Sequence, residues 1–148
     1  MELKRFNHIL ADFSQRIGIS PLSMPQNGRM VVRFENDFEL RLDLNLTEGF
    51  LKLSSTLAIS EKLDNEYAAM LLASNACWPS TKELFAVDSN TWQPMLYRII
   101  NLDRLTPAAL ETHLTEFYHS LVRWQEMLSG QFDQPSDNPS MFKQTIRV

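Results

Sequence analysis

The chain contains one cysteine, Cys77, and a thiol paired with a histidine is the most direct route to a catalytic site in this sequence. A thiolate activated by a neighbouring imidazole is a strong nucleophile, and His113 is one candidate for a catalytic histidine. Cys77, however, ends an apolar segment and precedes Trp78-Pro79, a context typical of a small packing residue. An enzyme that uses Cys77 or His113 is therefore the most distant of the functions that we consider.

The histidines do not follow a metal-binding pattern. His113 and His119 are six residues apart in a predicted helix, so they point to different faces of it. Glu116 lies one turn from His113, where an ordinary pair on the helix surface is the common outcome. With a single thiol in the chain, a structural zinc site would lack ligands. We expect no metal site and no catalytic residues.

Composition argues against several other kinds of partner. The four glycines are never clustered, so the chain has neither a Rossmann fingerprint nor a P-loop, and we expect no cofactor. A net charge of -4 disfavours a nucleic-acid partner, which requires a basic face. The longest apolar run, residues 67–73, is too short to cross a bilayer, and no signal peptide is evident. We expect a cytoplasmic protein with no membrane partner.

Apolar spacing and turn residues predict one α+β domain. Helices are expected over residues 3–17, 64–76 and 106–130, and strands over residues 30–34, 38–46, 51–59, 84–88 and 91–102. Pro94 cannot donate to a strand ladder, which places its part of the last strand at an edge or a bulge. The order α-β-β-β-α-β-β-α predicts a five-stranded, antiparallel, twisted sheet with three helices. The domain spans residues 1–130, and the polar residues 131–148 form a flexible tail, in which Ile146 is one of four apolar residues able to dock.

The second predicted helix is apolar around most of its circumference, including Tyr67, Met70 and Leu71. A helix of this kind must be buried on more than one side. One solution is that one face packs on its own sheet while the other meets a second copy of the chain. The alternative is a fully buried central helix in a monomer. If the helix joins two copies, a carboxylate at Met70 or Leu71 is expected to split the dimer.

The first predicted helix carries a wide apolar stripe that includes Leu3, Phe6, Leu10 and Phe13. One interpretation is that this stripe simply covers the core of its own domain. The other is that the stripe and an open strand edge bind an extended polypeptide, by pocket filling and by strand addition.

These segments, taken in order, resemble the class I type III secretion chaperones, the family that includes the Tir chaperone. The resemblance is carried by residues 10–19, by the strand pair 32–36 and 40–44, by residues 70–75 and 84–88, and by residues 114–117 and 124–128. The matching order of elements covers residues 2–130. Each segment is a pattern of apolar and small residues, and it is their order and spacing that are similar to the family.

The resemblance implies a homodimer that binds the N-terminal region of a secreted effector in extended form and delivers it for secretion, without ATP or any cofactor. Carried onto this sequence, it implies a dimer interface at Tyr67, Met70, Leu71, Ser74 and Trp78. It implies partner contacts on the first helix and on exposed parts of the sheet, at Leu3, Phe6, Leu10, Phe13, Val31 and Arg33.

A second function stays open within the same family. Some members act as regulators, which sequester an anti-activator and thereby switch on the secretion genes. The last residues, 143–148, resemble that subgroup. A regulator of this kind is expected to have two competing protein ligands, one secreted and one an anti-activator.

Overall fold

The structure, a computed structural model, describes residues 1–34, 38–59, 63–129 and 146–147. Its helices are α1 (Leu3–Ile17), α2 (Asn65–Asn75), α3 (Trp78–Thr81) and α4 (Pro107–Leu128). Its strands are β1 (Arg29–Phe34), β2 (Glu39–Asn45), β3 (Phe50–Thr56), β4 (Glu83–Val87), β5 (Pro94–Asn101) and β6 (Ile146–Arg147). All strand pairs are antiparallel, in the order β4-β5-β3-β2-β1-β6. The α+β fold predicted from the sequence is confirmed, and β1 to β5 form the predicted five-stranded antiparallel sheet.

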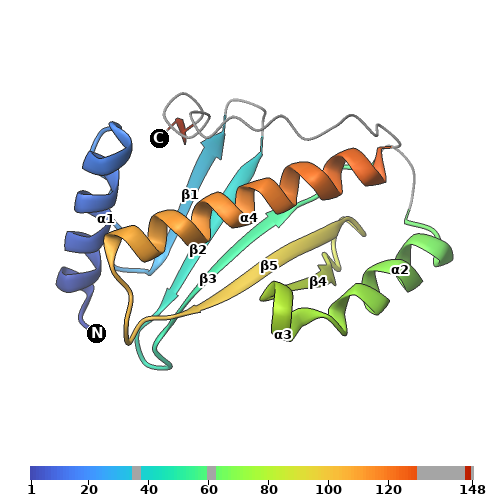
Figure 1. The fold of residues 1–148 in the computed structure, drawn as a ribbon, viewed down its shortest axis with the longest axis horizontal. Helices are drawn as coiled ribbons and strands as arrows, with labels where there is room; N and C mark the ends of the chain where they lie inside the picture. The colour runs from blue at the N-terminus through green and yellow to red at the C-terminus, as the bar shows by residue number, and fades with distance from the viewer. Residues whose placement is uncertain (35–37, 60–62, 130–145, 148) are drawn as a thin grey trace.

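The shorter helices lie at opposite ends of the molecule, with α1 at one end and α2 and α3 at the other (Figure 1). The long helix α4 crosses one face of the sheet, and α1 lies beside its N-terminal end. Helices α2 and α3 lie at the other end, where α2 packs on β4. No helix in the described ranges is both long enough and apolar enough to span a bilayer.

Local signals in the sequence define the helix ends. The side chain of Thr106 accepts a hydrogen bond from the backbone N–H of Ala109 at 3.1 Å, which caps the start of α4. Asp64 caps α2 in the same way, through the backbone N–H of Tyr67 at 2.8 Å. Gly18 ends α1 with φ of 74°, a left-handed conformation that glycine adopts without strain.

The core lies between the sheet and the two helices α1 and α4. Leu10 and Phe13 of α1 surround a small apolar void together with Val32 and Leu40 of the sheet and Leu114 of α4. The apolar stripe of α1 is therefore buried within a single chain. Of the two interpretations of this stripe, the structure supports the one in which it covers the core of its own domain.

Three details differ from the sequence prediction. A short extra helix, α3, follows α2, because Pro79 near its start suits a new helical turn. Pro94 is the first residue of an interior strand, where its missing N–H removes only the bond at the end of the β3–β5 ladder, so the expectation of an edge or bulge is wrong. Within the predicted tail, Ile146–Arg147 pair with β1 as β6, because an exposed strand edge is a template for pairing. For residues 131–145 and 148, the predicted flexibility lies outside the described residues.

Gly28 precedes β1 in a position that only glycine fits. Its φ is 69°, and an added Cβ would lie 2.7 Å from the backbone oxygen of Leu44. Gly49 has a similar φ of 73°, but no atom lies within 4 Å of an added Cβ. Gly28→Ala is therefore expected to lower the free energy of unfolding by about 1–3 kcal/mol more than Gly49→Ala, as a result of overpacking alone. Urea unfolding of the two variants measures this difference, and equal losses would show that the turn relaxes around the added methyl group.

Candidate protein-binding interfaces

The two sides of α2 have different surroundings. Leu71 is 3% exposed, and Met70 is half-buried against the core. The hydroxyl of Ser74 donates to the backbone oxygen of Met70 at 2.9 Å, within the helix. Leu72, the next residue around the helix from Leu71, is 71% exposed, and Tyr67, one turn before Leu71, is 39% exposed. The fully buried central helix considered from the sequence is therefore wrong, because one apolar side of α2 is open in a single chain.

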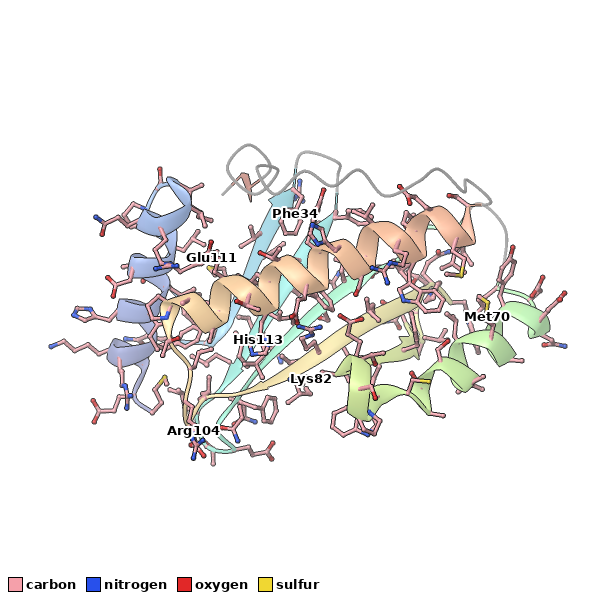
Figure 2. The ribbon with its side chains drawn as sticks, in the orientation of Figure 1. Phe34, Met70, Lys82, Arg104, Glu111 and His113 are labelled. Atoms are coloured by element: carbon pink, nitrogen blue, oxygen red, sulfur yellow. The ribbon has the colours of Figure 1, made fainter. Side chains whose placement is uncertain are left out.

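In the short helix α3, which follows α2, Trp78 is 48% exposed. Figure 2 shows Met70 on α2 at the end of the molecule far from α1. Five residues were expected at the dimer interface, and the structure separates them: Tyr67 and Trp78 lie on the open surface, while Leu71 is packed inside the chain. Leu72, which the sequence analysis did not select, is the most exposed large apolar residue of the described chain. We refer to Tyr67, Leu72 and Trp78 as the α2–α3 surface.

The β4 edge of the sheet is closed by side chains. The side-chain amide of Asn75 accepts from the backbone N–H of Phe85 at 2.7 Å and donates to the backbone oxygen of Phe85 at 3.1 Å. The hydroxyl of Thr81 lies 3.4 Å from both the backbone nitrogen and the backbone oxygen of Glu83. These contacts occupy the outward backbone groups of Glu83 and Phe85, which another strand would need for pairing.

The β1 edge is more open. Gly28 O accepts from Leu44 N–H at 2.7 Å and Phe34 N–H donates to Phe38 O at 2.9 Å, so the even-numbered residues of β1 bond to β2. The backbone groups of the odd-numbered residues then point away from β2. At this edge, β6 pairs with Arg33 and Phe34. In the described ranges, no strand pairs with the outer edge of β1, the side away from β2, before Arg33. The structure thus contains one example of strand addition at β1.

The outward side chains of β1 combine charge and apolar surface. Val31 is 48% exposed, and the side chains of Arg29 and Arg33 are 81% and 73% exposed. Arg33 lies 3.8 Å from Glu39, and an ion pair at such exposure contributes little to stability. Both sheet residues expected to contact a partner, Val31 and Arg33, are therefore accessible.

The partner residues expected on α1 have a different location. Phe6 and Leu10 are 0% exposed and Phe13 is 1% exposed, because α1 packs on the sheet and on α4. In this conformation these three side chains are unavailable to a partner, and the expectation that they bind one is corrected. Leu3 is half-buried and lines an open groove of about 510 Å³ together with Arg29 and Ile99.

A buried ionic cluster joins β4, β5 and α4. Arg98 is 4% exposed, and it contacts Glu83 at 2.8 Å and Glu116 at 2.7 Å. His113 lies on the α4 side of the same cluster, with its Nδ1 3.4 Å from Arg98 (Figure 2). The pKa of Glu83 is raised, because the effect of burial is larger than the opposing effects of its hydrogen bonds and of the charge of Arg98. Burial and the charge of Arg98 lower the pKa of His113.

Sequence reasoning missed this cluster, since Arg98 is surrounded in the sequence by apolar strand residues and nothing marks its partners. The cluster ties three elements together, so its role is structural. Cys77 is an exposed thiol at the start of α3, while His113 is half-buried beside Arg98. In the described part of the chain, no group of three or more His, Cys, Asp or Glu side chains is arranged to hold a metal ion.

An exposed apolar surface at one end and an accessible strand edge at the other define a small protein-binding protein. The Tir chaperone protein (CesT) family model matches residues 8–125, and the chain belongs to this family. The family predicted from the sequence, that of the type III secretion chaperones, is confirmed, and family and fold point to a non-enzymatic role.

Individual relatives agree with this family. The chain is 26% identical over 130 residues to the transcriptional anti-antiactivator ExsC of Pseudomonas aeruginosa, a match that covers 88% of this chain and 90% of ExsC. A chain in the crystal structure of the ExsC-ExsE complex is similar with a TM-score of 0.78 and 25% identity, over 86% of this chain and 96% of that chain. A chain of the HopA1-SchA chaperone-effector complex has a TM-score of 0.72 at 19% identity, over 85% and 98% of the two chains, which shows the same fold.

Proposed function

We propose that this protein is a cytoplasmic type III secretion chaperone that holds an extended segment of a secreted protein along β1. The observation that supports this most directly is the asymmetry of the sheet. The β4 edge is closed by Asn75 and Thr81, whereas the β1 edge already accepts a strand of the chain itself. Main-chain hydrogen bonds at an open edge bind an extended polypeptide with little dependence on its sequence.

Side chains beside β1 add specificity. The exposed side chains of Arg29, Val31 and Arg33 present two cations on either side of an apolar group. The groove lined by Leu3 and Ile99 provides a concave site near Arg29 in which apolar and polar side chains are mixed. A bound segment that alternates apolar and acidic residues matches this surface.

We also propose that two copies associate through the α2–α3 surface. The exposed side chains of this surface are Tyr67, Leu72 and Trp78, and contact of their apolar groups with water is unfavourable. Aromatic residues such as Tyr and Trp are also common at the centres of interfaces. This surface and β1 lie at opposite ends of the sheet, so a dimer leaves both β1 edges accessible (Figure 1).

A regulatory role is the second candidate, and a specific observation favours it. The relative that is 26% identical over most of both chains is a transcriptional anti-antiactivator, and a chain in the complex of that protein with ExsE has a similar fold. In this role the same β1 edge binds an anti-activator, and a secreted protein competes for the edge.

The proposed edge is tested by removing one donor. Val31 N–H points away from β2, so Val31→Pro removes it without breaking the β1–β2 ladder. We expect Val31→Pro to weaken binding of a co-purified partner by about two- to tenfold, the effect of one hydrogen bond. Calorimetry with the purified partner segment measures the change, and Val31→Thr, which retains the N–H and the size of the side chain, is the matched control.

Further variants separate the other possibilities. Unchanged affinity in Val31→Pro would show that the partner binds away from β1. One partner that displaces another from the same edge would support the regulatory role, whereas a single secreted partner would support the effector chaperone. Cys77→Ser and His113→Ala are expected to bind the partner normally, because neither residue lies on β1 or on the α2–α3 surface as defined above.

A further inference from the structure

The short strand β6 lies on the edge that the proposed function assigns to the partner. Residues 146–147 pair with Phe34 and Arg33, although 17 residues, 129–145, separate them from the end of α4. A segment of that length reaches about 50 Å when extended, so the chain connection itself does not dictate this position. The pairing is therefore a preference of the β1 edge for an extended strand.

We propose that β6 is an internal competitor that keeps the β1 edge closed until an incoming segment displaces it. Three residues of β1, namely Arg29, Val31 and Arg33, direct their backbone groups away from β2. The N–H of Arg29 is already bonded to the side chain of Asn27 at 3.1 Å, and Arg33 is paired with β6. In the described structure, Val31 is therefore the one residue of the three whose outward backbone groups remain available to a partner strand. A single residue does not make a strand ladder. A partner strand can pair with several residues of β1 only after β6 has dissociated from it.

The register of β6 makes it easy to displace. Arg147 stands directly opposite Arg33 in the antiparallel pair. Like charges at directly opposite positions destabilise a strand pair, while opposite charges stabilise it. A partner strand with a carboxylate at this position gains stability where β6 loses it. The inference rests on the proposed function, because β6 matters only if the β1 edge is where the partner binds.

Two variants of the full-length chain at Arg147 change the stability of the β6–β1 pairing in opposite directions. Arg147→Pro removes the N–H of the residue paired with Arg33 and weakens β6. Arg147→Glu places a carboxylate opposite Arg33 and strengthens β6. Arg104→Glu makes the same change of charge at an exposed residue outside β1 and β6, and it is the control (Figure 2).

The probe is a labelled peptide with the sequence of residues 141–148, titrated into each variant and followed by fluorescence anisotropy. If β6 occupies the edge for between half and nine-tenths of the time, Arg147→Pro binds the peptide about two- to tenfold more tightly than the unmodified chain. Arg147→Glu is expected to bind it more weakly than the unmodified chain, and Arg104→Glu equally well. A peptide that carries Glu in place of Arg147 is expected to bind Arg147→Pro more tightly than the native peptide does.

Hydrogen exchange of the Arg33 amide gives an independent measurement. Exchange is expected to be fastest in Arg147→Pro and slowest in Arg147→Glu. Equal peptide affinity and equal exchange in the three Arg147 forms would overturn the proposal. No secreted protein takes part in these assays, so failure of the proposed partner would not alter them, and failure of β6 would leave the proposed partner binding intact.

Discussion

Leu72→Glu is expected to convert a dimer into a monomer of 17.2 kDa without destabilising the fold. The side chain of Leu72 is 71% exposed in one chain, so a carboxylate there stays hydrated in the monomer. In the proposed dimer the same carboxylate is buried among apolar groups, where an unpaired charge costs several kcal/mol. A two-fold interface contains the substitution twice, so we expect the dimer to weaken by about a hundredfold or more.

Light scattering coupled to size-exclusion chromatography gives the mass of each variant. Gln15→Glu on α1 adds the same charge to an exposed helical residue at the other end of the molecule, and it is expected to remain a dimer. A dimeric Leu72→Glu would mean that the copies meet on another element. Leu71→Glu is a contrasting variant: Leu71 is 3% exposed within the chain, so this substitution is expected to unfold the region around α2 before it reports on any dimer.

Arg98→Ala is expected to lower the free energy of unfolding by about 3–5 kcal/mol, the typical effect of removing one partner from a buried ion pair. The substitution leaves Glu83, 7% exposed, without its cation, while Glu116, 54% exposed, turns to water. Arg16→Ala is the control, because Arg16 contacts Glu111 at a similar distance of 2.9 Å but on the surface. This surface pair is expected to contribute less than about 1 kcal/mol.

The pH dependence separates charge from packing in this variant. The pKa of Glu83 is already raised by burial in the folded chain, and the loss of Arg98 raises it further. A carboxyl group with a folded pKa above the unfolded value destabilises the fold as pH rises through that interval. The loss of stability caused by Arg98→Ala is therefore expected to be larger near about pH 7 than near about pH 4, where Glu83 is protonated.

Urea unfolding at the two pH values measures both parts of this prediction. The double variant Glu83→Leu/Arg98→Met removes both buried charges, and it is expected to recover most of the stability lost in Arg98→Ala. An equal loss at both pH values would show that the packing of the Arg98 stem, and not its charge, stabilises the junction of β4, β5 and α4.

The sequence alone determined the order of all the elements except α3 and β6, because this order follows from local patterns. Thr106-Pro107 starts α4, Gly18 ends α1, and alternating residues form β1, β2 and β3, each at or close to its predicted place. Periodicity depends only on neighbours in the chain, so it survives without knowledge of the fold. The family also followed from this order.

Only the tertiary structure decided which residues are available to a partner. α2 is apolar around most of its circumference, so no pattern within it distinguishes the buried Leu71 from the exposed Leu72; contact with β4 makes that choice. The stripe of α1 looked equally suited to a partner and to the core until the sheet and α4 covered it. Likewise, the closure of one sheet edge by Asn75 and the occupation of the other by β6 join residues from different elements. Burial depends on what packs from elsewhere in the chain, and that information is absent from any single segment.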